Sequence, residues 1–360
     1  MNCYLTRTGT YLPGPAIANE AIADYLGTFD GEEETRTKIL RMNGILTRHY
    51  ALDTNQDATH DLYDLGTAAA LDCIGENAPA SPITYLSAGT TNTPLVGPGI
   101  SSLLHDRLAK EGKLPHPVEI NSNAGICTAS AQALINGVRA VASGQHKTAL
   151  CIGAEQPSDI LKSSVMSPPD DRAEHEDIRK TKWFMSIFLR SMLSDGAGAF
   201  LLEDKPAESG LSFRVNWTYS RSFANQAPLC MKLENRSLLL SQDVSILAEH
   251  LPPCTREVVG GAFEANNDDL ATYKCVLPHL SSYFFKRYLL SVLREFCGGK
   301  AADHWTNLET AGNTGAASIY IMLDEYIRTH DLVDGDKIVL FIPESGQFNF
   351  AIISLTAVQK

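Results

Sequence analysis

The chain has 360 residues, of which 44% are hydrophobic and 20% are charged, and its formal net charge is −12. This composition is typical of a globular protein and excludes the fibrous and disordered classes. The negative charge argues against a general nucleic-acid binder, which needs a basic face to neutralise phosphates.

The first half of the chain alternates between segments of strand type and of helix type. Apolar periodicity and turn residues predict strands at 3–7, 83–88 and 148–155, and helices at 16–26, 60–74 and 100–111. The strand at 148–155 is apolar throughout, as buried strands are. This alternation predicts an α/β layered fold with largely parallel strand pairing.

The second half is less regular. The charged run at 170–180 predicts a surface helix or a lid, and we expect cap or tunnel elements in 205–260. Further strands are predicted at 196–203, 273–279, 336–342 and 349–355, with a helix at 281–296. The strand pair of 148–155 and 196–203 is echoed by the pair of 336–342 and 349–355, which predicts an internal duplication.

Eight cysteines lie far apart in the sequence: Cys3, Cys73, Cys127, Cys151, Cys230, Cys254, Cys275 and Cys297. None belongs to a Cys-x-x-Cys pair, so we expect no zinc site, and we expect no disulfide framework in so long a chain without secretory signals. The first residues lack the apolar core of a secretory signal, and no apolar run is long enough to span a bilayer. These features predict a cytoplasmic protein in a reducing compartment.

Cys127 follows an extended segment and a turn of small residues, and it precedes a helical run at 131–138. Free backbone N–H groups and the helix dipole at a helix start favour thiolate over thiol. This position predicts a nucleophile near neutral pH. The alternative is a buried small hydrophobic residue, because free cysteine is among the most buried residue types.

Two other polar residues stand at positions suited to catalysis. His279 ends the strand at 273–279, and Asn313 lies in a loop of small residues before a helix. Cys–His pairs serve nucleophilic catalysis, and an amide can orient the histidine or donate a hydrogen bond. The structural alternatives are an ordinary histidine after a strand and a helix-capping asparagine. Arg41, Arg48 and His49 could hold an anionic ligand such as a phosphate, or they are simply solvated.

Several segments resemble the type III ketoacyl-acyl carrier protein synthases of the thiolase superfamily. Residues 311–319 resemble that family's Gly-Asn-Thr-Ser-Ala-Ala-Ser motif, and residues 194–200 resemble its Gly-Asp-Gly-Ala-Gly-Ala strand. Cys127 stands at the position of the family's nucleophile, residues 44–48 resemble its Gly-Ile-x-x-Arg element, and Gly346 stands at its glycine-rich turn. The order and spacing of these segments hold over nearly the whole chain.

The resemblance implies a thiolase-like fold with two duplicated α/β halves, 1–204 and 205–360, in five αβαβα layers, usually as a homodimer. Cys127 would carry an acyl group, while His279 and Asn313 would donate hydrogen bonds to the carbonyl oxygen of a second thioester. The backbone N–H groups of Cys127 and Gly346 would hold the oxyanion of the acylation step. No resident cofactor or metal is implied, because the substrates arrive on the phosphopantetheine of acyl carrier protein or coenzyme A.

The chain departs from the family in two places. The family's His-Gln-Ala-Asn reads His279-Leu280-Ser281-Ser282 here, and its tryptophan near the Gly-Ile-x-x-Arg element has no clear counterpart. Both departures favour carrier-bound or larger substrates over fatty-acid initiation with acetyl coenzyme A. Candidate docking residues for an acidic carrier follow on the next helix, unless that helix face is merely solvated: Lys286, Arg287 and Arg294.

Glu155 ends the strand at 148–155, where the initiation enzymes commonly carry Asp or Ser. A carboxylate there could act as a base on a β-ketoacyl group. With the altered histidine motif, this is similar to the ketosynthase/cyclases that build dialkylresorcinol or cyclohexanedione rings from two acyl thioesters. The alternative is that Glu155 caps a turn or pairs with a basic side chain.

We therefore predict an acyltransferase of secondary metabolism that joins two acyl thioesters by Claisen condensation through acyl-Cys127, with ring closure as the finer hypothesis. The alternatives within the family are a fatty-acid initiation ketosynthase III, using acyl coenzyme A and malonyl carrier protein, and a related acyltransferase. Outside the family, a degenerate scaffold that dimerises and binds carrier protein is a further alternative, but it would not need Cys127, His279 or Asn313. A cysteine hydrolase could use Cys, His and Asn, but the duplication and the motifs argue against it.

Overall fold

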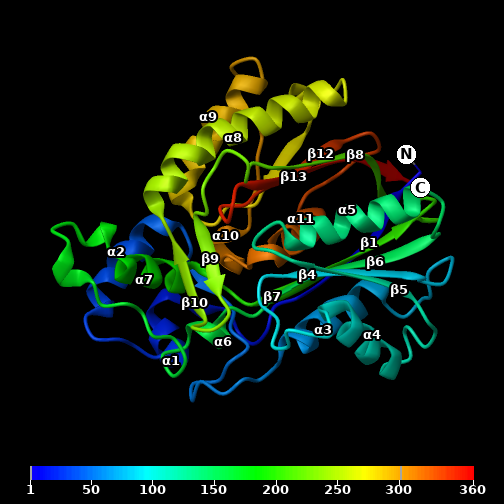
Figure 1. The fold of residues 1–360 in the computed structure, drawn as a ribbon. Coiled ribbons are helices and arrows are strands. Elements are labelled where there is room, and N and C mark those ends of the chain that lie inside the picture. Colours follow the sequence, from blue (N-terminus) through cyan, green and yellow to red (C-terminus); the bar gives the residue numbers. More distant parts are fainter. Residues whose placement is uncertain (1, 301) are drawn as a thin grey trace.

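The computed structural model describes residues 2–300 and 302–360, and its main element is a nine-stranded sheet (Figure 1). The strands of this sheet are β1 (Tyr4–Tyr11), β4 (Tyr85–Thr90), β5 (Glu119–Ala124), β6 (Thr148–Glu155), β7 (Gly196–Glu203), β8 (Leu211–Ser222), β11 (Cys275–Pro278), β12 (Lys337–Pro343) and β13 (Asn349–Gln359). Two small sheets pair β2 (Ile17–Ala18) with β3 (Thr47–Arg48), and β9 (Met231–Glu234) with β10 (Leu239–Gln242).

The helices vary in length from single turns to α8, which runs through 22 residues. They are α1 (Ile22–Leu26), α2 (Glu32–Asn43), α3 (Leu62–Ile74), α4 (Ile100–Lys110), α5 (Ala129–Ala142), α6 (Ser158–Leu161), α7 (Lys182–Met192), α8 (Val244–Ala265), α9 (Lys286–Phe296), α10 (Leu308–Ala311) and α11 (Ser318–Thr329). Within the described residues, no helix is both long enough and apolar enough to cross a bilayer.

The strand pairing repeats in the two halves of the chain. β4 runs parallel to β6, β6 antiparallel to β7, and β7 antiparallel to β1. In the same way β11 runs parallel to β12, β12 antiparallel to β13, and β13 antiparallel to β8. A short antiparallel contact between β1 and β8 joins the two sets. The fold is therefore duplicated, while the division at residues 204 and 205, which lie between β7 and β8, stays a prediction.

The prediction of largely parallel pairing was wrong. The strands in the middle of the sheet, β13, β8, β1 and β7, pair antiparallel with one another. In the second half the cause is local, because only residues 344–348 separate β12 from β13. A connection that short forms a hairpin, whereas parallel neighbours need a crossover of a dozen or more residues.

The layers follow the order αβαβα (Figure 1). Helices α3 and α4 pack on the outer face of the first set of strands, and α8 lies against β8 and β13 on the outer face of the second set. Between the two sets of strands lie α5, which packs on β4 and β6, and α11, which packs on β7 and β1. The segment that precedes α5 is therefore held in the middle of the molecule.

Two less regular regions differ from the sequence expectation. The charged run at 170–180 forms two short 3₁₀ turns, Arg172–Glu174 and Ile178–Lys180, instead of a helix. In 205–260, β8 is a central strand of the large sheet, so that part of the cap prediction was wrong. The β9–β10 hairpin and α8 do provide covering elements there, because residues of both line pockets.

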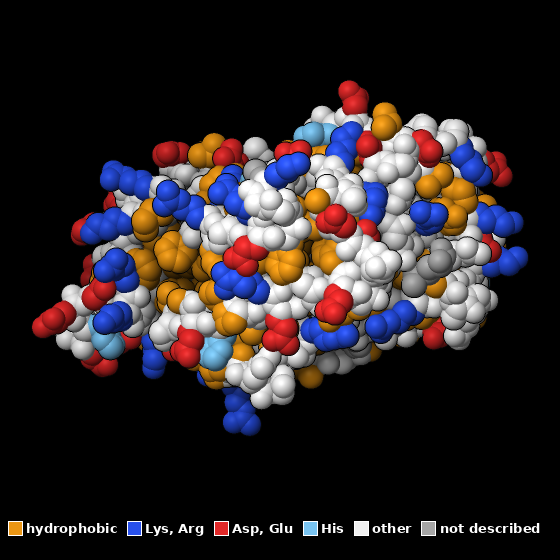
Figure 2. Space-filling model, turned by 90° about the horizontal axis from the view of Figure 1, so that it is seen from above, with side chains coloured by type: hydrophobic (Ala, Val, Ile, Leu, Met, Phe, Trp, Pro, Cys, Tyr) orange, Lys and Arg blue, Asp and Glu red, His pale blue; other side chains and the backbone are white. Residues whose placement is uncertain are grey.

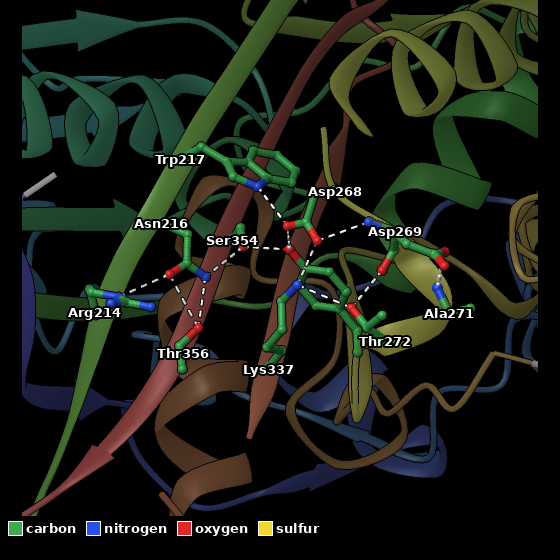
Figure 3. Close-up of polar contacts among 11 residues, drawn as sticks. Arg214, Asn216, Trp217, Asp268, Asp269, Ala271, Thr272, Lys337, Ser354 and Thr356 are labelled. Atoms are coloured by element: carbon green, nitrogen blue, oxygen red, sulfur yellow. Dashed lines mark hydrogen bonds and ion pairs between the residues drawn. The ribbon is translucent and has the colours of Figure 1, made fainter. Parts of the chain in front are cut away.

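A polar network fastens the loop after α8 to the large sheet (Figure 3). Asp268 Oδ2 accepts hydrogen bonds from Trp217 Nε1 (2.9 Å) and Tyr273 OH (2.6 Å). Its Oδ1 accepts one from Lys337 Nζ (2.5 Å). Burial alone would raise the pKa of Asp268, but the bonds from Lys337, Tyr273 and Trp217 outweigh it and lower the pKa to about 2. The network therefore favours the charged carboxylate in the folded state.

This network predicts an acid-sensitive contribution to stability. A carboxyl group with a depressed folded pKa contributes fully above its unfolded pKa, and the contribution is lost as the pH falls through the folded pKa. Asp268→Asn should therefore lower the free energy of unfolding by about 2 kcal/mol at pH 7, and by much less near pH 2. Urea denaturation at the two pH values checks this, with Asp269→Asn as the matched control. Equal stability of Asp268→Asn and the unmodified protein at pH 7 would contradict it.

Candidate active site

Cys127 lies in the turn between β5 and α5, two residues before the first residue of the helix. The amide of Ala129 donates to the carbonyl of Ile126 (3.1 Å), so the chain begins to wind before the helix proper. The Cys127 side chain is only 9% exposed and contacts the apolar layer around α5. It also lines two pockets, so it is both a buried residue and an accessible one.

The charges around Cys127 oppose its ionisation. Burial raises the pKa of the thiol well above its ordinary value, and the nearby carboxylates of Glu344 and Glu155 raise it further. The expected thiolate at a helix start is therefore wrong for this structure. Removal of the thiol proton must accompany the attack on a substrate, and that requires a group able to accept it.

His279 follows directly after β11 and lines one of the pockets together with Cys127. Its amide donates to the carbonyl of Phe341 (2.8 Å), and its side chain is buried. In the described part of the chain neither ring nitrogen has a hydrogen-bond partner. Burial lowers the pKa of His279 to about 4, so the imidazole is neutral at pH 7.

Such a histidine does not fit a purely structural role. Buried polar groups are nearly always hydrogen-bonded, because leaving one unpaired costs about 1–3 kcal/mol. A neutral imidazole offers one N–H donor and one acceptor nitrogen. His279 can therefore accept the proton of Cys127 in one step and donate a hydrogen bond to a substrate oxygen in another.

Asn313 lies between α10 and the 3₁₀ turn Gly315–Ala317, and its side chain is buried. Its Oδ1 accepts from the amide of Gly315 (3.0 Å). Its backbone is fixed on both sides, because its N–H donates to Met192 and its carbonyl accepts from Ser194. Asn313 does cap a turn, as the structural alternative proposed. The same contact orients the amide and leaves Nδ2 to donate toward a ligand.

Glu155 is the last residue of β6, and it is 4% exposed. Its Oε1 accepts from Thr91 N (2.9 Å), Thr91 Oγ1 (2.6 Å) and Ala316 N (3.3 Å), so Oε2 carries none of these bonds. Burial raises the pKa of Glu155 to about 7 in spite of those donors, and Asp195 adds to the rise. Near neutral pH the carboxyl group is thus divided between acid and base forms, which suits proton transfer.

Two pockets meet at Cys127. The first contains His279, and its apolar wall comes from α8, α9 and β12: Leu247, Leu251, Tyr288, Leu289 and Phe341. The second contains Glu155 and Asn313, and its apolar wall comes largely from α7, its C-terminal flank and the β9–β10 hairpin: Met192, Leu193, Met231, Leu233 and Leu240. Like Cys127, three other residues line both pockets: Gln242, Ser281 and Ser345.

The surface above these elements is hollowed. Viewed from the side of α8 and α9, the molecule has a hollow lined by hydrophobic side chains, at the end where α2 and α7 lie (Figure 2). Basic and acidic side chains both stand around the hollow. This face therefore combines apolar area with charges of both signs.

The structure places Gly346 beneath the nucleophile turn. A Cβ atom at Gly346 would lie 3.0 Å from Ile126 Cδ1, so the two turns are in close contact. The Gly346 carbonyl accepts from the amides of Cys230 (2.9 Å) and Met231 (3.1 Å), which fastens the start of the β9–β10 hairpin to the same turn. Its neighbour Ser345 lines both pockets.

The predicted basic groups lie in two places. On α9, Arg287 and Arg294 are exposed and seven residues apart, which puts them on one helix face, while Lys286 lies over the ring of Tyr283. Near the N-terminus, Arg48 is fully buried, with Nη2 donating to Asn19 Oδ1 (2.9 Å). His49 is half-buried and Arg41 is exposed on α2. The structure therefore does not form one surface anion site from Arg41, Arg48 and His49.

Sequence reasoning missed Gln242, Ser345 and Glu344. Gln242 ends a short hairpin strand, and Ser345 stands in a five-residue turn, so neither has a local pattern that marks a site. Glu344 is a charged residue in a turn, and only its burial, with 2% exposed, marks it as unusual. That burial cannot be read from the sequence.

Comparison with known proteins agrees with this geometry. Residues 264–346, which contain His279, Asn313 and Gly346, match the family model of the 3-oxoacyl-[acyl-carrier-protein] synthase III C-terminal domain. The tetronic acid condensing enzyme AbyA1 superposes with a TM-score of 0.77 at 19% identity, covering 98% of this chain and 99% of that one. The fold is thiolase-like.

Two further solved structures are similar along their whole length. The synthase III FabH of Pseudomonas aeruginosa has a TM-score of 0.72 at 20% identity, with 98% of each chain covered. A variant of OleA from Xanthomonas campestris has a TM-score of 0.75 at 17% identity, covering 99% of this chain and 98% of that one. The thiolase-like fold of our chain thus extends beyond the segment matched by the family model.

Proposed function

We propose that the protein is a condensing acyltransferase that joins two acyl thioesters through an acyl-Cys127 intermediate. The observation that carries the proposal is that four candidate catalytic residues come together around two adjoining pockets. Cys127, His279, Asn313 and Glu155 come from four separate segments, and all of them line the two pockets that meet at the thiol. A scaffold protein gains nothing from a buried histidine that lines a pocket with a cysteine and whose ring has no hydrogen-bond partner among the described residues.

The first step is acyl transfer. The sulfur of Cys127 attacks the thioester carbonyl while His279 accepts the thiol proton, and the backbone N–H groups of Cys127 and Gly346 hold the oxyanion. The carbon–sulfur bond of the donor then breaks, and its thiol leaves with the proton from His279. The product is acyl-Cys127 with the imidazole neutral again.

The second step forms the carbon–carbon bond. A second thioester becomes an enolate by loss of carbon dioxide or of an α-proton, and the donors of His279 and Asn313 stabilise the enolate oxygen. The enolate carbon attacks the acyl-Cys127 carbonyl, and the bond to sulfur breaks. The cysteine thiolate takes up a proton, from solvent after decarboxylation or from the base that removed the α-proton, and the β-ketoacyl product leaves on the carrier.

The two apolar pockets support a reaction between two acyl chains, one on each side of Cys127. Glu155, in the second pocket, supports the finer proposal that a base acts on the β-ketoacyl product and promotes ring closure of the dialkylresorcinol or cyclohexanedione type. An enzyme of this kind belongs to secondary metabolism. Since these groups suffice for the chemistry, we propose that no resident cofactor or metal is needed.

The carriers would be acyl carrier protein or coenzyme A. Arg287 and Arg294, exposed on one face of α9, support docking of an acidic carrier. The eight cysteines are all unpaired and buried, which supports a reducing, cytoplasmic location.

A homodimer is also proposed, on the evidence of the sheet edge. β5 forms one end of the large sheet, and its residues are mostly exposed, including Ile120 (42%). The loop after β4 carries Leu95 and Val96, which are exposed as well. An unprotected edge strand with apolar neighbours is a template for pairing with another chain, and a second copy would cover it.

Incubation with an acyl thioester tests the function. We expect one acyl mass to be added to the protein, and peptide mapping to place it on Cys127. Cys127→Ala should remain unlabelled, while Cys254→Ala, the matched control at a buried cysteine outside the pockets, should be labelled like the unmodified protein. Equal labelling of Cys127→Ala would overturn the proposal.

Fatty-acid initiation is the second candidate, because the match over 264–346 is to a synthase III domain. That reaction requires release of carbon dioxide from a malonyl thioester. Measuring carbon dioxide with malonyl carrier protein and with longer β-ketoacyl thioesters distinguishes the two candidates.

A further inference from the structure

Glu344 is a buried carboxylate to which neither the motifs nor the reaction steps above assign a role. It follows β12 directly, and it is 2% exposed. Its amide donates to the carbonyl of Asn349 (2.8 Å), which closes the turn at 344–348. A buried charge is retained only where specific partners hold it, so the partners indicate its purpose.

Both carboxylate oxygens are engaged, and one of them binds the residue next to the nucleophile. Oε2 accepts from Thr128 N (3.0 Å) and Thr128 Oγ1 (2.5 Å). Oε1 accepts from Asn349 Nδ2 (2.8 Å). A Cβ atom at Gly346 would come within 2.8 Å of Oε1, so the turn of Ser345 and Gly346 is built tightly around this carboxylate.

These bonds tie together the two turns that form the proposed acylation site. One turn carries Cys127, and the other carries Ser345, which lines both pockets, and Gly346, the proposed oxyanion donor. Their relative position sets the distance from the thiol to the backbone donors. Displacements of about 1 Å at such a site can cost about 10²-fold in rate.

The carboxylate also determines the charge around the thiol. The titratable groups that face Cys127 are Glu344 from the β12–β13 turn, Glu155 from β6 and the neutral His279 after β11. None of these three groups supplies a positive charge at pH 7 that could stabilise a thiolate. Since Thr128 N–H is already bound to Glu344, that helix-terminal donor is not available to the sulfur either.

We propose that Glu344 is a positioning residue for Cys127, which fixes the nucleophile turn against the Gly346 turn and holds the sulfur in the thiol form. The inference rests on the proposed role of Cys127 as the acyl carrier. A thiol kept protonated reacts slowly with oxidants and alkylating agents. At neutral pH it gives up its proton to His279, which lines the same pocket, when a substrate carbonyl is in place to be attacked.

The rate of Cys127 alkylation by iodoacetamide, followed by mass spectrometry across pH, tests this inference. Glu344→Gln keeps the size of the side chain and removes its charge, so the pH midpoint of alkylation should fall by about one unit or more. Thr128→Val removes the hydroxyl contact and keeps the charge, so it reports on packing alone and its midpoint should stay within about 0.3 units of the unmodified protein. An unchanged midpoint in Glu344→Gln would overturn the proposal.

A second variant covers the case in which Glu344→Gln does not fold. Glu344→Asp keeps the charge but withdraws it by one methylene from Thr128, so acylation of Cys127 by a thioester should slow at least about tenfold. Acylation at the unmodified rate would overturn the positioning role. The alkylation assay needs no thioester, so absence of acylation in the unmodified protein would refute the proposed function separately from this inference.

Discussion

Above pH 8, replacing His279 by alanine should reduce the rate of condensation by at least about 10²-fold, while acylation of Cys127 should fall much less. The enolate oxygen of the second substrate would lose one of its two donors, in a buried site where water cannot replace it. Acylation retains the backbone donors of Cys127 and Gly346, and bulk solvent can take the thiol proton at high pH. The two steps should therefore separate, most clearly above pH 8.

Single-turnover measurements can resolve this separation. Acyl-Cys127 is formed first and followed by mass, and its consumption is then timed after a second thioester is added. Asn313→Ala should show the same pattern, because its Nδ2 is the other donor. Leu280→Ala is the matched control, since it opens the pocket beside His279 without removing a donor. Equal loss of both steps in His279→Ala would contradict this separation, because it would show that the histidine is needed as much for acylation as for condensation.

The site residues proposed from the sequence each lie in a segment with its own local signature, and their catalytic roles stay predictions. Asn313 stands in a loop of small residues, His279 ends an apolar strand, and Glu155 ends another. The His279 ring is buried and has no hydrogen-bond partner in residues 2–300 and 302–360, and it lines a pocket with Cys127, which agrees with the functional interpretation. The duplication could also be predicted, because the paired strands near the ends of the two halves repeat in the sequence, whereas the five layers were implied by the family resemblance.

The charge state of Cys127 could not be predicted from its neighbours in the chain. A local argument includes the helix dipole, but the group that opposes it, Glu344, bonds to Thr128 across 216 residues of sequence. Only the fold brings the β12–β13 turn under the start of α5. The same limit applies to Arg48. Its sequence context suggests an anion-binding or solvated side chain, but it is fully buried in the structure.

The central position of β8 was also hidden from sequence reasoning. Its exposed positions are mixed with buried ones, and beside its apolar and aromatic residues it holds Arg214, Asn216, Arg221, three serines and a threonine. Asn216 is accommodated because its amide donates to Ser354 Oγ (2.9 Å) and Thr356 Oγ1 (2.8 Å) on the neighbouring β13 (Figure 3). Hydrogen bonds between polar side chains on neighbouring strands satisfy these groups. Without such partners, a polar residue in the sequence argues against a strand inside the sheet.

Glu155→Gln should acylate normally and yield less cyclised product. A base must be ionised to remove a proton, so the step that Glu155 serves should speed up as the pH rises through about 7 in the unmodified protein. In Glu155→Gln that step should be slow at every pH. Product profiles by mass spectrometry from pH 6 to 8 test this, and Glu155→Asp should keep the pH dependence with lower yield.

The same substitution should stabilise the protein, because burial of Glu155 favours its neutral form. Its carboxyl group has a pKa of about 7 in the folded protein and an ordinary value of 4.5 in the unfolded chain. Between pH 4.5 and 7 the unfolded chain therefore loses this proton while the folded protein keeps it, which favours unfolding as the pH rises. The group therefore costs the fold about 3 kcal/mol above pH 7 and nothing below pH 4.5. Glu155→Gln, which keeps an acceptor for Thr91 and Ala316, should be more stable by up to that amount at pH 8 and equal near pH 4. If Glu155→Gln is more stable and makes less product, Glu155 is retained for its chemistry. If Glu155 only capped a turn, the substitution would lower the free energy of unfolding instead.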